Sequence, residues 1–236
     1  MNHVSTSSEA MSLRPDPWLG EQLGKPAWHL TPTAEPGRHV AVPGDGPCFV
    51  DARLPVSRTE VAAQLEDAGF RLVDTNVQLE RKVWPAAIGR RSRFAGPEDR
   101  AVVERIAERS FTFSRFHLDP LIDDQDADRI KRSWAGNFFS GERGDGMIVA
   151  QHDGEIGGFL QFLLTGDALT IDLVAVDSRL RGKGLARDMI AHAESAVPGV
   201  EQLRVGTQLA NVPSLRFYFG DGFQLATSSY VFHYHG

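Results

Sequence analysis

One continuous stretch constrains the fold more than any other part of the chain: residues 169–194, LTIDLVAVDSRLRGKGLARDMIAHAE. Leu169–Val176 is a branched apolar run, which predicts a strand with both faces covered. The residues after Gly184 carry apolar side chains at helical spacing and predict an amphipathic helix. The turn between them, Arg179–Gly184, combines arginines with glycines, which let backbone N–H groups turn inward. Because a helix N-terminus also carries a partial positive charge, this turn predicts a phosphate or pyrophosphate site.

The motifs that the turn lacks narrow the identity of that anion. A P-loop requires GxxxxGK followed by Ser or Thr, whereas Gly184 and Leu185 stand here. A dinucleotide-binding fingerprint requires three spaced glycines and an acidic residue about 20 positions later, and neither is present. The alternative without a ligand is a tight turn with solvated arginines. Three basic residues beside two glycines favour anion binding instead.

Composition excludes several other classes of protein. The chain has 236 residues and a formal net charge of −6, which argues against general binding to nucleic acid or anionic membranes. The longest apolar run, Ile156–Leu164, contains Gln161 and is too short to cross a bilayer. The single cysteine, Cys48, excludes an internal disulfide and a cysteine-only metal site. Since the first residues do not resemble a secretory signal, we expect a soluble cytoplasmic protein.

Changes in composition along the chain predict a short tail and two domains. Residues 1–13 are polar and are predicted to be disordered. Residues 14–84 predict a small α/β domain, in which a capping box at Ser57–Glu60 opens a helix. Residues 85–236 predict the order strand, helix, helix, three strands, helix, strand, helix, strand, beginning with a strand at Ala86–Arg93.

The pattern R-x-x-G-x-G, placed between a strand that ends Val-Ala-Val and an amphipathic helix, resembles the acyl-CoA-binding motif of the GNAT acetyltransferase superfamily. The resemblance implies an α/β (α+β) fold, with a mixed, mostly antiparallel central sheet flanked by helices. Two adjacent parallel strands of that fold splay apart around the thioester. Acetyl-CoA would be the co-substrate, and its pantetheine arm would pair with the backbone of Val174 and Val176. The residues implied to hold the pyrophosphate and adjacent groups are Arg179, Arg181, Gly182, Lys183, Gly184, Leu185 and Ala186.

More of the chain resembles one subgroup, the dTDP-fucosamine acetyltransferases of bacterial surface polysaccharide biosynthesis. The matching stretches are Phe113–Phe116, Gly69–Val73 and Leu203–Gln208, and the α/β domain ahead of the core also matches. The resemblance implies an N-acetyltransferase that acts on the amine of a nucleotide-linked 4-amino-deoxysugar. Transfer would be direct, in a ternary complex, because the core domain contains no cysteine for a covalent intermediate. The segments His117–Pro120 and Phe232–His235 depart from the subgroup, which leaves the sugar open.

Tyr218 and Asp172 are candidates for proton transfer, and Asn211 is a candidate for binding the CoA arm. Tyr218 aligns with the tyrosine that protonates the departing CoA thiolate in many GNAT enzymes, whereas Phe217 is the more natural packing residue. Asn211 aligns with the position that hydrogen-bonds the CoA arm, although asparagine before Pro213 is also common in turns. Asp172 lies inside an apolar strand, where an unpaired carboxylate is costly. It deprotonates the amine, binds the substrate amine or pairs with an arginine, and these interpretations stay open.

Acceptor-binding residues are expected in the loop before the second core helix and at strand ends. Arg115 is predicted to clamp a nucleotide-sugar pyrophosphate in bidentate fashion. His117 is predicted to contact the sugar or to act as a base, with ordinary surface or core placement as the alternative. His233 and His235 share one face of the last strand, but without an evident third ligand we expect no metal site. The further acceptor candidates are Asp74, Asp119, Thr207, Gln208 and His233.

Two other functions stay open. The first is a GNAT enzyme that acts on a different amine: an amino acid, a polyamine, an antibiotic or a protein N-terminus. The second is a non-catalytic module that binds acyl-CoA as a sensor. We expect a small-molecule amine as the partner and no nucleic acid or membrane, and a homodimer is compatible with the resemblance.

Overall fold

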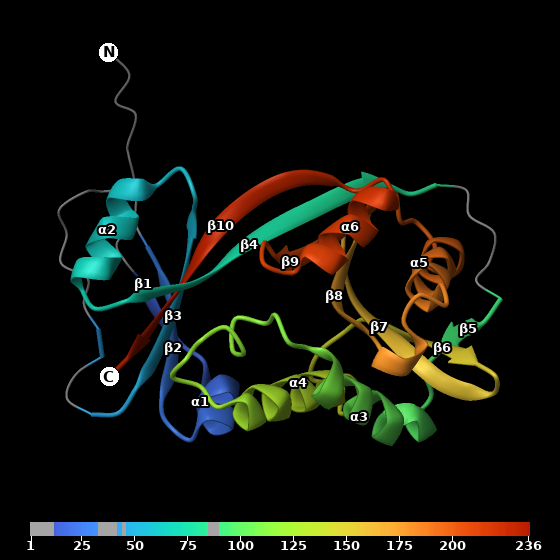
Figure 1. Cartoon of the computed structure of the whole chain (residues 1–236), viewed down its shortest axis with the longest axis horizontal. Coiled ribbons are helices and arrows are strands. Elements are labelled where there is room, and N and C mark those ends of the chain that lie inside the picture. The colour runs from blue at the N-terminus through green and yellow to red at the C-terminus, as the bar shows by residue number, and fades with distance from the viewer. Residues whose placement is uncertain (1–11, 33–41, 44–45, 85–89) are drawn as a thin grey trace, which may run out of the picture. The chain divides into compact units, whose positions relative to one another are not determined.

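The computed structural model describes residues 12–32, 42–43, 46–84 and 90–236 (Figure 1). The tail predicted at residues 1–13 lies outside this range except for its last two positions, and so does the first half of the strand predicted at Ala86–Arg93. Two units make up the described chain. One contains the residues up to Thr75 together with Ser228–Gly236, and the other contains Asn76–Thr227. The units therefore divide within β4 (Arg71–Lys82) and β10 (Gln224–His235), whereas the sequence predicts one boundary after residue 84.

The first unit is a small sheet with two helices. In it β1 and β2 pair antiparallel, β2 and β3 pair parallel, and β3 pairs antiparallel with the end of β10. Its core contains Leu54, Leu65 and Phe232, which agrees with the predicted α/β character. Its complete elements are β1 (Ser12–Pro15), α1 (Pro17–Leu23), β2 (Ala27–Thr31), β3 (Phe49–Pro55) and α2 (Thr59–Asp67).

Local contacts explain how the two helices of this unit begin. Asp16 caps α1 by accepting a hydrogen bond from the Leu19 N–H at 3.0 Å, and Pro17 occupies the first helical position. The capping box predicted at Ser57 is wrong, because α2 begins one residue later. Arg58 is its N-cap, and in the described structure no side chain forms a capping hydrogen bond there.

The second unit contains a six-stranded sheet in the order β4-β9-β8-β7-β6-β5. Only β8 and β9 pair parallel, so the predicted mixed, mostly antiparallel sheet is confirmed.

No helix of the described chain has the length and apolar character needed to span a bilayer. Besides β4 and the start of β10, the elements are β5 (Ser92–Phe94), a 3-10 turn (Pro97–Asp99), α3 (Arg100–Ser110), α4 (Asp124–Phe139), β6 (Gly146–His152), β7 (Glu155–Thr165), β8 (Ala168–Val176), a second 3-10 turn (Ser178–Leu180), α5 (Leu185–Ala196), β9 (Gln202–Gln208) and α6 (Val212–Gly220).

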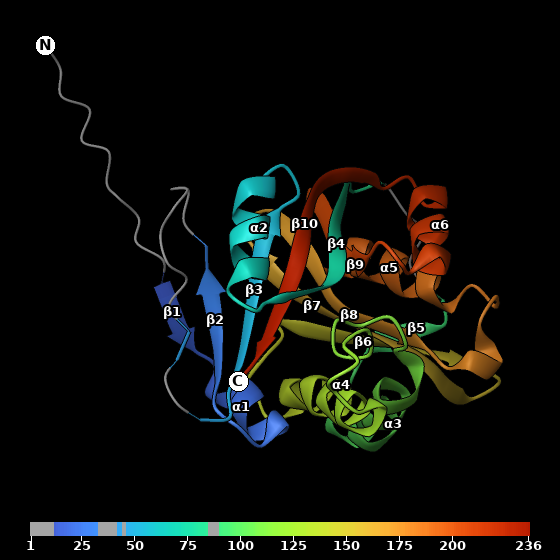
Figure 2. The ribbon, with the colours of Figure 1, turned by 60° about the vertical axis from the view of Figure 1, so that its left-hand side comes forward.

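Helices cover both faces of this sheet. Figures 1 and 2 show α3 and α4 on one face and α5 and α6 on the other. Side chains of β6 alternate between the two cores: Ile148 and Ala150 pack with α5 residues, whereas Met147 and Val149 pack with α3 residues. A strand that is buried on both faces is continuously apolar, as the sequence of the central strands indicates.

The parallel strands β8 and β9 separate partway along their length. They pair only from Ala168 with Gln202 to Ile171 with Val205. At the next residue the register of β8 against β7 shifts: Ile171 faces Phe162 and Leu173 faces Gln161, so Asp172 is the extra residue of a β-bulge. A bulge bends its strand and ends regular pairing, which explains why the two strands diverge here.

A buried carboxylate ties β5 to the start of α3. Asp99 is 3% exposed and accepts hydrogen bonds from Arg93 at 2.6 and 2.9 Å and from the Gly96 N–H at 2.8 Å. The hydrogen bonds from Arg93 hold the pKa of the Asp99 carboxyl below its usual value, although burial opposes this shift. The ionised form is therefore the one that the fold stabilises.

We expect Asp99→Asn to lower the free energy of unfolding at neutral pH by about 1–2 kcal/mol, because it removes hydrogen bonds to a charged acceptor. Since the folded pKa is depressed, this stabilisation is present above the unfolded pKa of about 3.9 and is lost as pH falls through the folded pKa. Urea unfolding across that range should show the two proteins converging in acid. A difference that stays constant with pH would contradict this assignment.

Candidate active site

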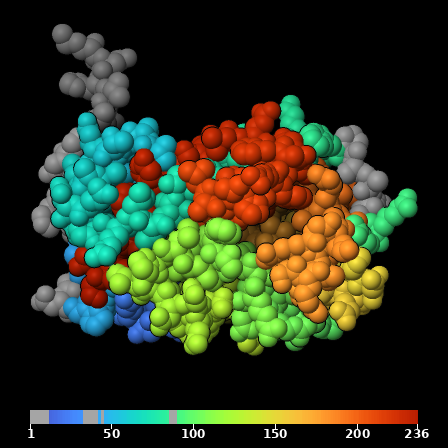
Figure 3. Space-filling view, viewed as in Figure 1, coloured from blue at the N-terminus to red at the C-terminus, as the bar shows by residue number. Residues whose placement is uncertain are grey.

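A cavity of about 520 Å³ opens in the second unit between the diverging ends of β8 and β9. The space-filling view shows the surface hollowed between α6 and the orange segment that follows β8 (Figure 3). Four segments contribute to its wall: the residues after α3, the end of β8, the turn into α5, and the connection from β9 through α6. The lining residues are Ser110–Ser114, Val174–Val176, Leu180–Gly182, Gly184–Arg187, Gln208, Asn211, Pro213, Ser214, Phe217 and Tyr218.

The end of β8 presents an open strand edge to this cavity. Val174 and Val176 remain paired with β7, opposite Leu160 and Gly158, but the pairing with β9 has already ended at Ile171. An open edge offers backbone N–H and C=O groups to an extended ligand, which binds as an added strand would. The structure therefore places both predicted pantetheine-binding residues at the cavity wall.

The turn into α5 supplies a cluster of backbone donors. Gly182 and Gly184 have φ angles of 76° and 78°, in the left-handed region that favours glycine. The first hydrogen bond of α5 runs from the Asp188 N–H to the Gly184 carbonyl at 3.0 Å. The preceding N–H groups, from Leu185 to Arg187, have no acceptor within the helix, and these residues line the cavity. Donors at the positive end of a helix form an anion site.

The basic side chains of the turn differ in where they point. Arg179 donates to the Asp177 carboxylate at 3.1 and 2.9 Å, and its side chain is 75% exposed. The hydrogen bonds from Arg179 lower the pKa of Asp177. Arg181 lines the cavity and donates to the carbonyls of Val176 at 3.3 Å and Ser110 at 3.2 Å. Arg179 and Lys183 do not line the cavity. Arg179 therefore matches the alternative in which the arginines of the turn are solvated.

Asn211 and Tyr218 both line the cavity from the β9–α6 side. Asn211 also caps α6: its side-chain oxygen accepts from the Ser214 N–H at 3.3 Å, so the predicted turn role and the predicted site position coexist. Tyr218 is 4% exposed and packs edgewise on Phe217 and Phe223. Burial raises the pKa of the Tyr218 phenol well above its ordinary value, so the phenol stays protonated at neutral pH.

The geometry at Asp172 favours the arginine-pairing interpretation over the role of base. Arg143 donates to its carboxylate at 2.7 and 2.6 Å, and Gln161 donates at 2.9 Å. The indole N–H of Trp134 adds a fourth hydrogen bond at 3.0 Å. The Asp172 side chain is 8% exposed. Because the donors already occupy both oxygens, this carboxylate is a poor candidate for taking a proton from an amine.

The acceptor candidates in the loop after α3 do not all reach the cavity. The Arg115 guanidinium stacks over the Phe116 ring at 4.6 Å, and Asp119 accepts from the Leu121 N–H at 2.9 Å in a local turn. Both lie outside the residues that line the cavity. His117 is also outside the lining, but its Nδ1 lies 2.6 Å from the hydroxyl oxygen of Ser114, which does line it.

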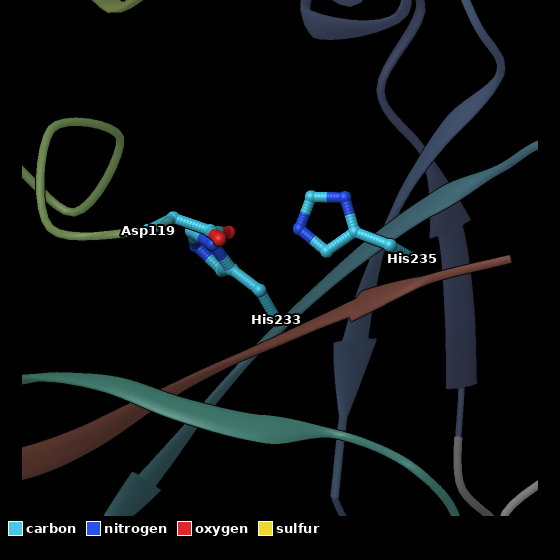
Figure 4. Close-up of side chains that lie close together, drawn as sticks. All are labelled: Asp119, His233 and His235. Carbon is cyan, nitrogen blue, oxygen red and sulfur yellow. The ribbon is translucent and has the colours of Figure 1, made fainter. Parts of the chain in front are cut away.

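The remaining candidates lie on strands. Gln208 lines the cavity, whereas Thr207 is buried outside the lining and its hydroxyl accepts from the Asn211 amide at 3.5 Å. Asp74, on β4, and His233, on β10, are buried residues of the first unit. His233 and His235 project from β10, as Figure 4 shows, with ring centroids 6.3 Å apart.

Ser114 and Arg187 are among the lining residues to which the sequence patterns assigned no role at the site. Arg187 lies in the first turn of α5 and donates to the Asp221 carboxylate at 2.8 Å. Its position three residues after Gly184 was a usable signal, because side chains of a first helical turn flank the anion site. Ser114 carries a weaker signal, the Ser-x-x-His spacing to His117.

Residues 103–223 of the chain match the model of the Acetyltransferase (GNAT) family. The spore coat polysaccharide biosynthesis protein SpsD of Bacillus subtilis is 36% identical over 140 residues. The match covers 58% of this chain and 48% of that protein, so the chain spans about half the length of this relative.

Two solved structures share the fold. A GCN5-related N-acetyltransferase from Sphaerobacter thermophilus aligns with a TM-score of 0.57 at 18% identity, covering 82% of this chain and 62% of that one. A conserved protein of unknown function from Staphylococcus epidermidis aligns with a TM-score of 0.66 at 9% identity, covering 100% and 94%. Identities this low establish common architecture, and they carry no argument about substrates.

We expect Asp172→Asn to lower the free energy of unfolding by about 2 kcal/mol, because it leaves the Arg143 guanidinium without its charged partner. Arg143→Gln should cause a loss of similar size, and the double variant should lose less than the sum. Guanidinium unfolding of the four proteins measures this coupling. The opposite outcome would be an Asp172→Asn protein of wild-type stability that has lost turnover while Arg143→Gln retains it. That result would show that Asp172 takes part in the reaction.

Proposed function

Because the chain belongs to the GNAT acetyltransferase family, we propose that it transfers the acetyl group of acetyl-CoA to the amine of a small, nucleotide-linked amino sugar. The observation that carries the donor half of this proposal is the cavity between β8 and β9. There an open strand edge and the N-terminus of α5 face the same space.

The residues around the cavity fit acetyl-CoA. Backbone N–H groups of Leu185–Arg187 suit a pyrophosphate, and Arg181 adds a positive charge at the same wall. The edge of β8 suits the amide-containing pantetheine arm, while Phe113 and Phe217 supply apolar surface. When bound, acetyl-CoA supplies the activated thioester. We propose that the chain's own part is to hold that thioester beside Tyr218 and away from water.

Tyr218 is the proposed general acid. It lines the cavity at the α6 side, and its phenol is protonated at neutral pH, as a phenol with an ordinary pKa of about 10 already is. A free thiol has a pKa of about 8.5, so a departing thiolate accepts a proton readily when a donor is held beside it. A phenol that stays protonated until the thiolate forms meets that requirement.

The acceptor half of the proposal has two supports. The relative SpsD is named for spore coat polysaccharide biosynthesis, which is consistent with sugar chemistry. The stretches Phe113–Phe116 and Leu203–Gln208 resemble the dTDP-fucosamine enzymes, and they contribute Phe113, Ser114 and Gln208 to the cavity wall. Arg115 lies in the first of these stretches but outside the cavity lining, so it is the proposed contact for a nucleotide pyrophosphate that extends beyond the cavity.

We expect Tyr218→Phe to lower kcat about 100-fold while leaving the affinity for acetyl-CoA unchanged, because the ring still packs but the proton donor is gone. Thiol release measures turnover, and calorimetry measures binding. Tyr230→Phe, which removes a phenol of the first unit, is the matched control and should retain activity. Full turnover in Tyr218→Phe would remove the tyrosine from its assigned role.

The acceptor class is tested by thiol release from acetyl-CoA across a panel of amines. We expect amino-sugar nucleotides to give the highest kcat/KM. Amino acids, polyamines and aminoglycoside antibiotics serve as the competing classes. Preference for one of these would replace the acceptor, and tight CoA binding with no release from any amine would identify a sensor instead of an enzyme.

A further inference from the structure

Three side chains beside the cavity form a hydrogen-bonded chain that the proposed function leaves unused. The Ser114 hydroxyl oxygen lies 2.6 Å from His117 Nδ1, and His117 Nε2 lies 3.1 Å from the Asp128 carboxylate. Ser114 is 4% exposed and lines the cavity. The side chains of His117 and Asp128 are 6% and 39% exposed. The chain of contacts therefore runs from the cavity wall to the solvent.

Local structure holds these groups in place. Ser114 and His117 belong to one turn, in which the Leu118 N–H donates to the Ser114 carbonyl at 3.0 Å. The His117 N–H also approaches the Ser114 hydroxyl oxygen, at 3.4 Å. Asp128 comes from a different element, the first half of α4. A histidine fixed between a hydroxyl and a carboxylate has little freedom to rotate, which is typical of positioned acid–base groups.

The partners determine which nitrogen of neutral His117 carries the proton. A carboxylate only accepts, so Nε2 carries the hydrogen and donates it to Asp128. Nδ1 is then an acceptor, and the Ser114 hydroxyl donates to it. The hydroxyl oxygen has two lone pairs, and the weak contact from the His117 N–H occupies one of them. The other lone pair is available to accept a proton.

We propose that Ser114, His117 and Asp128 form a proton relay that deprotonates the acceptor amine during acetyl transfer, an inference that rests on the proposed acetyltransferase function. As the amine nitrogen attacks the thioester carbonyl carbon, the C–N bond forms and the C–S bond breaks. The amine proton passes to the Ser114 oxygen while the hydroxyl proton passes to His117 Nδ1. Asp128 stabilises the resulting imidazolium.

Proton exchange with the solvent returns His117 and Tyr218 to their starting protonation states after each turnover. Tyr218 gives its proton to the thiolate, so one turnover leaves a phenolate at Tyr218 and an imidazolium at His117. The imidazolium then releases one proton toward the partly exposed Asp128, and the phenolate takes one up. The relay supplies the base that the other candidates do not, because Tyr218 stays protonated and Asp172 is occupied by its four donors.

The charged groups around His117 favour this direction of transfer. Asp128, from α4, is the carboxylate that faces its ring. Among the other charged side chains of these segments, Lys131 of α4 lies over the rings of Phe111 and Trp134, and Arg115 lies over Phe116. The negative charge of Asp128 stabilises the protonated imidazole by direct electrostatic attraction.

The relay predicts a graded series of rates. Ser114→Ala should lower kcat about 100-fold with the KM for acetyl-CoA unchanged, and Ser114→Thr, which keeps the hydroxyl, should recover most of that loss. Asp128→Asn should lower kcat about tenfold, because the imidazolium loses its counter-charge. The matched control is His152→Gln at the β6–β7 hairpin, where another histidine lies 3.5 Å from an aspartate, Asp153, away from the cavity lining. It should behave as wild type.

The pH profile separates a relay from mere packing. With one acceptor amine throughout, kcat/KM of the wild-type protein should show a limb that rises with pH and then levels off. Asp128→Asn should move this limb to lower pH, and His117→Gln should abolish it. The ionisation of the amine itself cannot move between variants. A limb that stays in place in both variants, or full kcat in Ser114→Ala, would overturn the relay.

An activity-independent measurement keeps this inference separate from the proposed function. Ring ¹⁵N chemical shifts of His117 in the full-length protein should show the Nε2–H tautomer in the neutral ring. The Nδ1–H tautomer would overturn the relay even in an active enzyme. If wild-type protein released no thiol with any amine, the proposed function would fail, while the NMR result would still decide whether the chain of hydrogen bonds exists as described.

Discussion

At the bulge in β8, the Asp172 carboxylate accepts hydrogen bonds from Arg143, Trp134 and Gln161. These donors come from α4, the loop after it and the neighbouring strand β7. Three separate segments therefore stabilise the β-bulge at Asp172. The pairing of β8 with β9 ends one residue earlier. A carboxylate buried inside a strand therefore has a physical reason: it stabilises the point at which two parallel strands part and the cavity begins.

The turn into α5, which forms another wall of the cavity, depends on close packing against the sheet. Gly157 of β7 is one example, because a Cβ there would collide with the side chains of Leu180 and Leu185. The missing side chain lets the turn into α5 lie directly on the sheet and presents the first N–H groups of the helix to the cavity. Strand divergence, a tight turn and a helix N-terminus thus combine around one cavity, the proposed donor site, while the loop before α4 supplies Ser114 and its histidine.

Sequence patterns predicted the second unit well, because its elements are long and periodic. Apart from the two 3-10 turns, the predicted order of strand, helix, helix, three strands, helix, strand, helix and strand is the order observed from β5 to β10. In the first unit, β1, α1 and β2 were missed, since each has seven or fewer residues and too few turns or alternations to establish a period. At the site, the pattern identified Gly182–Ala186 without showing where side chains point. Arg179 is turned away by Asp177, and the partners of Asp172 lie far from it in sequence.

Amide hydrogen exchange with and without saturating acetyl-CoA is the direct test of whether the gap between β8 and β9 binds the acetyl donor. We expect slower exchange at Val174–Val176 and at Leu185–Arg187 when acetyl-CoA is bound. Exchange in the last turn of α5, at His192–Ala196, should not change, because that turn lies outside the residues that line the cavity. Protection confined to other segments, or none at the β8 edge and the start of α5, would contradict donor binding in this gap.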